Sequence, residues 1–430
     1  MERRNFLKNV TLGTGSLLTM PYLQHADAAE FAIPGKKLKL PLHKLKKPLA
    51  IAMWDFSWLL RHHRYGEFEN WEKVLNELAE RGYNAIRLDV FPQYVAADSD
   101  GKITEEFRSV KSGWAPAKWG NDYTMSFRPR EALLEFIPLC RKYGFRVALS
   151  SWFTNHNTGS RGIFTEEGGA LRGWTETLTF LKQHNLLDDN VIYIDLLNEY
   201  PKYHGYDWFK MEMNKRGDVD QFKLNNPTAF IPDNLDMGKV AGYNSLQQKF
   251  MHDFGNNLIA KIKKRFPDYP YQMSLTYTTP LDSIDISEFG TLDSHLWFTA
   301  AADIPHWRSL AGIDQSKDNR PQFQELMNFW EAKKPEMTIW MDKAITAVSN
   351  KAKQNKITCG NTEGWGPVGW LDHPELNWNW VKEAADIAVV LAKKHENYKY
   401  ICSSNFTHPQ FKGIWEDIKW HRKITSLIKE

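Results

Sequence analysis

The sequence predicts an α/β fold, a TIM (β/α)8 barrel with long loops after its strands. Strand-like and helix-like segments alternate eight times from about residue 48 to the C-terminus, without a break in composition. Eight such units are what this barrel requires, and a chain of 430 residues leaves room for insertions. A doubly wound open sheet is the structural alternative, but no glycine-rich phosphate-binding motif follows the first strand.

The expected strands are short apolar and β-branched runs with little polar alternation, which is typical of strands buried on both faces. In chain order they are PLAIAMW (48–54), NAIRLDVF (84–91), FRVALSSWF (145–153), VIYIDLLNEYP (191–201), YQMSLTY (271–277), TLDSHLWF (291–298), KITCG (356–360) and KYICSSN (399–405).

The segments between these strands show helical periodicity. The first helix has an apolar face from Phe68 to Leu78, and the second begins at Pro129, a residue favoured in a first helical turn. The remaining expected helices cover 169–183, 244–266, a short turn at 283–289, the two segments 321–333 and 337–353, then 377–395 and the C-terminus.

Composition excludes several classes of function. Hydrophobic residues make up 42% and charged residues 25%, as in soluble globular proteins, and a net charge of +3 is too small to indicate nucleic acid or a membrane surface as the partner. Three cysteines cannot form a disulfide framework, and no Cys/His spacing indicates zinc; the adjacent His62 and His63 rarely chelate without further ligands. We expect no metal and no cofactor. Eighteen tryptophans offer stacking surfaces for ring-shaped ligands.

The N-terminal segment has the features of a cleavable signal peptide. RRNFLK precedes a short apolar stretch and then ADAAE, which is the order of a signal peptide. The Arg3–Arg4 pair resembles a twin-arginine export signal. We therefore expect a signal peptide over 1–28, a basic linker over 29–47, a single barrel over 48–430, and a mature protein that is periplasmic or extracellular. The alternative is a tail retained in the cytoplasm.

Function in such a barrel lies at the carboxyl ends of the strands. From strands one to eight, these ends carry Trp54 and Asp55, Arg87 and Asp89, Trp152, Asn198 and Glu199, Thr276 and Tyr277, His295 and Trp297, Glu363, and Asn405. The ring holds carboxylates, an amide, an imidazole, a guanidinium and several indoles, a set suited to acid–base chemistry on a polar ligand.

Two glutamates at the ends of opposite strands indicate a reaction catalysed by a pair of carboxyl groups. Glu199 ends the fourth strand, and Glu363 follows the seventh among three glycines in CGNTEGWG. Strands four and seven lie across the barrel from each other, so the two carboxylates face each other over the central pocket. Retaining glycoside hydrolysis needs two carboxyl groups about 5 Å apart, one to protonate the leaving oxygen and one to attack the anomeric carbon.

This arrangement resembles glycoside hydrolase clan A and its cellulase-like members, such as glycoside hydrolase family five. The resemblance rests on the Asn-Glu pair ending strand four, the lone glutamate ending strand seven, GYNAIRLDVFP at strand two and DSHLWF at strand six. It implies that Glu199 is the general acid/base and Glu363 the nucleophile. It further implies that Asn198 binds the sugar 2-hydroxyl, that Arg87 orients Glu363, and that His295 lines the sugar site.

The chain also departs from the clan pattern at three strands. Trp297 stands where cellulases carry a tyrosine, SSWF replaces a segment with a histidine, and strand eight offers Asn405 instead of a tryptophan. The main prediction is an exported retaining β-glycosidase acting on an oligosaccharide or polysaccharide. The alternative is a carbohydrate-binding barrel without turnover. The sequence leaves the sugar, the linkage and the oligomeric state open.

Further substrate contacts are expected from other strand ends. We predict Trp365, two residues past Glu363, as a stacking platform for a sugar ring. Trp54 and Asp55 are placed at the non-reducing subsite, although Asp55 could equally be a structural cap. Trp152 completes the set, together with His295 and Trp297 at the end of strand six and Asn405 at the end of strand eight.

The export signal can be tested directly. Replacing Arg3 and Arg4 by Lys should leave the precursor inside the cell, because a twin-arginine signal is read by its receptor through both guanidinium groups. Cell fractionation followed by immunoblotting measures this, with Lys36→Arg plus Lys37→Arg in the linker as the matched control. Normal export of the Arg3, Arg4 variant would contradict the assignment.

Overall fold

The structure is a computed structural model that describes residues 40–111, 119–121, 124–156, 158, 161–216, 243–277, 279, 281–282, 284–298, 320–367 and 371–430. The expected signal peptide and most of the linker lie outside these residues. Among the described residues, no helix combines the length and the apolar character needed to cross a membrane.

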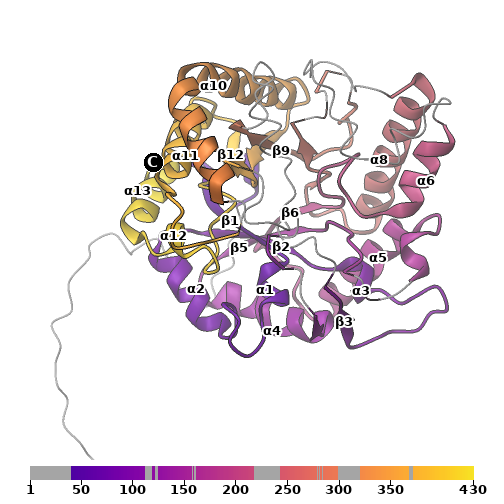
Figure 1. Cartoon of the computed structure of the whole chain (residues 1–430). Coiled ribbons are helices and arrows are strands. Elements are labelled where there is room, and N and C mark those ends of the chain that lie inside the picture. Colours follow the sequence, from indigo (N-terminus) through magenta and orange to yellow (C-terminus); the bar gives the residue numbers. More distant parts are fainter. Residues whose placement is uncertain are drawn as a thin grey trace, which may run out of the picture.

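The strands form a parallel sheet that curls around a common centre (Figure 1). They are β1 (Leu49–Asp55), β2 (Ala85–Asp89), β5 (Arg146–Ser150), β6 (Val191–Asp195), β7 (Tyr271–Gln272), β8 (Leu275–Thr276), β9 (Thr291–Trp297), β10 (Thr358–Asn361), β11 (Gly364–Trp365) and β12 (Tyr398–Cys402). β1 pairs with both β2 and β12, so the first and last strands of the barrel are neighbours. The predicted (β/α)8 barrel is confirmed.

The fifth barrel strand is split into two short pieces. β7 pairs with β6, whereas β8 pairs with β9, and a bridge between Tyr200 and Leu275 links the segment after β6 to β8. Following these pairings leads from β1 around the sheet and back to β1. The eight strands expected from the sequence therefore occupy the eight positions of the ring.

Helices surround the sheet (Figure 1). The longer ones are α2 (Trp71–Glu80), α4 (Pro129–Lys142), α5 (Gly169–Gln183), α6 (Asp207–Lys215), α8 (Ser245–Arg265), α10 (Arg320–Gln354), α11 (Asn379–Lys393) and α13 (Ile418–Lys429). Shorter elements are η2 (Leu42–Lys44), α1 (Ser57–Leu60), α3 (Pro92–Val95), η4 (Gly162–Phe164), α12 (Lys412–Trp415) and the hairpin of β3 (Phe107–Ser109) with β4 (Met125–Phe127).

Local sequence signals explain where several helices begin. The side chain of Asn70 accepts a hydrogen bond from the backbone N–H of Lys73 at the start of α2, and Asn244 and Gln247 form a reciprocal capping box at the start of α8. Pro129 occupies the first turn of α4, as predicted, because its missing N–H would have no partner there.

Two helix predictions are wrong. The segments 321–333 and 337–353 form one helix, α10, with Pro335 inside it. The apolar side chains on both sides of the proline, among them Trp330 and Met337, are buried, and this packing holds the helix across the lost hydrogen bond. The expected turn over 283–289 is not helical at 284–289, where Ile284 and Ile286 alternate into the core as in an extended chain.

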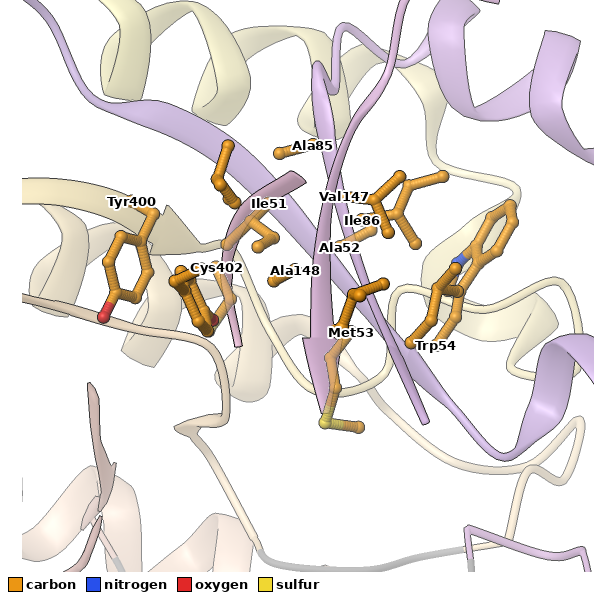
Figure 2. Close-up of a cluster of buried hydrophobic side chains, with 14 of the residues drawn as sticks. Ile51, Ala52, Met53, Trp54, Ala85, Ile86, Val147, Ala148, Tyr400 and Cys402 are labelled. Atoms are coloured by element: carbon orange, nitrogen blue, oxygen red, sulfur yellow. The ribbon is translucent and has the colours of Figure 1, made fainter. Parts of the chain in front are cut away.

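Strand alternation decides which side chains enter the barrel. On β1, Trp54 points outward and contacts Phe68 and Phe136. Figure 2 shows its indole on the same side as Ile86 and Val147, away from Met53. Successive strand residues point to opposite faces, so Met53 faces the interior.

Tight packing inside the barrel can be tested at one glycine. A Cβ on Gly360 of β10 would lie 2.3 Å from the ring of Tyr400, so Gly360→Ala should lower the free energy of unfolding by about 1–3 kcal/mol. Gly255, within α8, is the matched control: its nearest neighbour is 3.5 Å away, and Gly255→Ala should raise stability by about 0.5–1 kcal/mol. Chemical denaturation measures both. Equal stability of the two variants would contradict this packing.

Candidate active site

Glu199 is held by the chain that continues β6 beyond its last paired residue. Its backbone N–H donates to the Ser274 hydroxyl at 3.0 Å, and its φ of 51° lies in the left-handed region. The flanking backbone is fixed on both sides, by Asn198 N–H to the Ser151 carbonyl at 2.8 Å and Tyr200 N–H to the Ser274 carbonyl at 2.9 Å. A strained, fully hydrogen-bonded backbone of this kind is typical of functional sites.

Glu363 comes from the turn between β10 and β11. The backbone N–H of Thr362 donates to Asp293 at 3.1 Å, and the side-chain amide of Asn361 donates to the Glu363 carbonyl at 2.9 Å. These bonds fix the backbone on both sides of the carboxylate. Glu363 is 1% exposed.

The two glutamates meet at His295 of β9. One carboxylate oxygen of Glu199, one ring nitrogen of His295 and one carboxylate oxygen of Glu363 all lie within 4.8 Å of one another. His295 Nδ1 lies 3.0 Å from Glu199 Oε1 and 3.5 Å from Glu363 Oε1. Glu199 and Glu363, which follow the fourth and seventh strands, therefore lie close together, as the sequence predicts.

Arg87 of β2 supplies the positive charge. Its Nη1 lies 2.6 Å from Glu363 Oε1, and its Nη2 lies 3.2 Å from Asp195 Oδ2 and also donates to Asn198 Oδ1. Asp55 Oδ2 is 3.7 Å from Nη1. The guanidinium and the carboxyl groups it contacts are fully buried, so each charge depends on its partners for stabilisation.

Burial controls the protonation of the site. Loss of solvent raises the pKa of Glu199 to about 8, an effect that Arg87 opposes and Asp55 reinforces. Burial likewise raises the pKa of Glu363, against the attraction of Arg87, with Asp55 and Glu199 adding to the rise. Burial and the nearby guanidinium lower the pKa of His295, so this imidazole is neutral. A raised pKa favours the protonated form of Glu199 at neutral pH.

Four other predicted residues lie close to this centre. Trp152 Nε1 donates to Asp55 Oδ2 at 2.7 Å, which places both at the ends of β1 and β5. The backbone N–H of Asn405 donates to the Gly364 carbonyl at 2.8 Å, next to Glu363. Trp297 is buried at the end of β9, and its indole stacks on that of Trp119 with ring centroids 6.2 Å apart.

Two predicted substrate contacts are placed in the core instead. Trp54 faces the helices, and its Nε1 donates to the Thr407 carbonyl at 3.0 Å, so it cannot reach a sugar inside the barrel. Trp365 is fully buried, and its Nε1 donates to the Cys402 carbonyl at 3.0 Å. Neither indole has a face open to a ligand. The error arose because position near a strand end does not reveal which way a side chain points.

Sequence reasoning missed the buried aspartates beneath the site. Asp195 pairs with Arg87, and Asp293 accepts hydrogen bonds from Thr362 and from the Tyr193 hydroxyl. A signal was available, since Asp293 precedes His295 by two residues and so shares its strand face.

The cluster of Glu199, His295 and Glu363 could bring three donor atoms to one cation. Arg87, however, already places a positive charge 2.6 Å from Glu363 and would repel a second cation. Away from this cluster, His62 Nδ1 bonds the Phe68 carbonyl at 2.8 Å and His63 Nδ1 bonds the Arg64 carbonyl at 3.0 Å. The donor set thus fits acid–base chemistry better than metal binding.

A parallel barrel with two facing carboxylates at its strand ends is the architecture of a glycoside hydrolase-like protein. A scan of protein families agrees, since residues 51–429 match the sugar-binding cellulase-like family. The chain belongs to this family. The predicted cellulase-like relationship is therefore confirmed.

The chain is similar to several solved structures, and the first of them shares its fold. A protein of Parabacteroides distasonis ATCC 8503, provisionally described as a glycoside hydrolase, is 24% identical with a TM-score of 0.71; the match covers 90% of this chain and 94% of that one. The cellulose synthase subunit Z of Clostridioides difficile is 12% identical, with 89% and 100% coverage and a TM-score of 0.49. The endo-β-1,4-mannanase of Thermotoga petrophila is 10% identical, with 91% and 78% coverage and a TM-score of 0.48. A comparison with curated proteins finds no match.

The core position of Trp365 has a measurable consequence. Trp365→Ala should lower the free energy of unfolding by about 3–5 kcal/mol, because it removes a fully buried indole. Trp365→Phe, which keeps most of the apolar area, should cost clearly less. Denaturation by urea measures both; unchanged stability of Trp365→Ala would mean that the indole is free to stack on a ligand.

Proposed function

We propose that the protein is a retaining β-glycosidase that hydrolyses O-glycosidic bonds by double displacement. The observation that carries this proposal is the approach of Glu199 and Glu363 carboxylate oxygens to within 4.8 Å. Retaining enzymes hold their carboxyl groups about 5–5.5 Å apart, whereas inverting enzymes leave about 6.5–9.5 Å for a water molecule. The family relationship supports the same reaction class.

Glu363 acts as the nucleophile. Its carboxylate must be ionised to attack the anomeric carbon, and Arg87 Nη1, 2.6 Å away, stabilises that negative charge. The bond between Glu363 and the sugar forms while the bond from the anomeric carbon to the leaving oxygen breaks. The positive charge that develops on the sugar ring is stabilised by the buried carboxylates around it.

Glu199 acts as the general acid and then as the general base. A pKa of about 8 keeps its proton available for the leaving oxygen at neutral pH. After departure of the leaving group, the ionised Glu199 takes a proton from water, which attacks the glycosyl-enzyme and releases Glu363. His295 Nδ1, 3.0 Å from Glu199 Oε1, holds this carboxyl group in position through both steps.

Asn198 provides a binding group for the sugar. Its Oδ1 accepts hydrogen bonds from Arg87 and Ser274, but its buried Nδ2 has no partner among the described residues. A buried amide donor without an acceptor is costly, and a sugar hydroxyl would satisfy it. We assign this contact to the 2-hydroxyl of the sugar attacked by Glu363.

We also propose an exported enzyme whose substrate is a β-linked oligosaccharide or polysaccharide. The twin-arginine-like segment at the N-terminus supports export. Outside the cytoplasm, polymeric carbohydrate is an accessible substrate. Trp152 and Trp297 at the strand ends provide indoles near the site, and activity on a panel of glycosides identifies the sugar.

The two glutamates can be assigned by chemical rescue. Glu363→Ala should abolish turnover, because no glycosyl-enzyme can form, and azide should then give a glycosyl azide of inverted configuration. Glu199→Ala should retain glycosylation by activated aryl glycosides but accumulate the intermediate, and azide should give a product of retained configuration. Nuclear magnetic resonance of the products distinguishes the two, and Glu166→Ala, outside the site, serves as the control.

Opposite stereochemistry from the two variants is the expected result. Equal and modest losses in both variants, or a wild-type protein that binds sugar but turns over no glycoside, would favour a non-catalytic carbohydrate-binding protein instead.

A further inference from the structure

Asp55 is placed against the nucleophile by a distortion of β1. The pairing register between β1 and β2 shifts between Met53 and Asp55, and Asp55 has a φ of 30°, in the left-handed region. Non-glycine residues rarely adopt this conformation, and they persist in it where the surrounding structure holds them. The distortion turns a fully buried carboxyl group towards Arg87 and Glu363.

The carboxyl groups of Asp55 and Glu363 are both buried and converge on one guanidinium, that of Arg87. Both face the same nitrogen of Arg87, at 3.7 Å and 2.6 Å. Asp195 pairs with the same guanidinium, so one positive charge faces three buried carboxyl groups. Protonation of one group reduces this excess of negative charge.

The remaining neighbours of Asp55 favour its anionic form. Trp152 Nε1, which can only donate, approaches Asp55 Oδ2 at 2.7 Å, whereas the Ser150 hydroxyl lies 3.4 Å from Asp55 Oδ1 but closer, at 3.0 Å, to the Leu88 carbonyl. Donors of this kind stabilise a carboxylate over a carboxylic acid. At low pH the proton of the pair therefore rests on Glu363, where it prevents attack on the sugar.

We propose that Asp55 is a positioning residue for the nucleophile: it shares a proton with Glu363 and sets the pH at which Glu363 becomes ionised. This role deepens the proposed glycosidase function and, for its activity readout, rests on it. The negative charge of Asp55 raises the pKa of Glu363, as burial does, while Arg87 lowers it. The groups that interact electrostatically with Asp55 are Arg87 and Asp89 of β2, Glu199 after β6, and Glu363 after β10. Asp195 of β6 contacts the same guanidinium, and His295 of β9 lies 3.5 Å from Glu363.

Asp55→Asn removes the charge and keeps the shape. The amide can still accept from Trp152 and can donate to Glu363, so the nucleophile stays ionised at lower pH. With an activated aryl β-glycoside, whose departure needs no proton from Glu199, the acid limb of kcat/KM should move down by about one pH unit or more. Asp100→Asn, an exposed residue, is the matched control and should leave the limb in place.

A second readout does not require turnover. The C=O stretch of a protonated buried carboxyl group can be followed by infrared difference spectroscopy against pH, and Glu363→Gln identifies the band of Glu363. In Asp55→Asn this band should disappear at a lower pH than in the wild type. Trp152→Phe removes one hydrogen-bond donor to the Asp55 carboxylate, so Asp55 holds the proton more strongly and Glu363 loses it at a lower pH. The Glu363 band should therefore shift in the same direction as in Asp55→Asn, by a smaller amount. This second variant serves if Asp55→Asn does not fold.

The two readouts separate the inference from the proposed function. If no glycoside is turned over but the infrared band moves as expected, the glycosidase proposal fails and the proton-sharing pair stands. If the wild type is active and neither the acid limb nor the band moves in a folded Asp55→Asn or Trp152→Phe variant, Asp55 is only a structural residue and the inference is overturned.

Discussion

A single buried guanidinium, Arg87, holds the interior of this barrel together electrostatically. It contacts carboxyl groups from three other parts of the chain, Asp55, Asp195 and Glu363, as well as the amide oxygen of Asn198. Each of these groups would be costly to bury alone. Burial raises the pKa of both candidate catalytic glutamates, and the neighbouring carboxyl group of Asp55 adds to the rise, while Arg87 opposes it.

The parallel barrel is what allows these distant residues to meet. Every strand of the ring ends at the same face, so Asp55, Glu199 and Glu363 converge although the chain separates them widely. Regular strand geometry does not suffice, since Asp55 and Glu199 both adopt left-handed backbone conformations. Neutral His295 then bridges the two glutamates and keeps their carboxyl groups apart without adding another charge.

The strands and the pair of glutamates could be predicted from sequence because both depend on local patterns. Apolar runs mark the strands, and Asn198-Glu199 at the tip of one run marks a strand end. Side-chain direction could not be predicted: Trp365 and Trp54 sit at the expected strand ends but face the core. The convergence of Asp55 and Glu363 on one nitrogen of Arg87 also escaped prediction, because it depends on a register shift in β1 that no local pattern reveals.

The central claim is that Glu199 and Glu363 carry out a double displacement beside Arg87. Its most direct test is the configuration of the first sugar released by the wild-type protein. Proton nuclear magnetic resonance during hydrolysis of an aryl β-glycoside should show the β-anomer first, with the α-anomer appearing only later by mutarotation. Initial release of the α-anomer would contradict the account, because it would require direct attack by water instead of a glycosyl-enzyme.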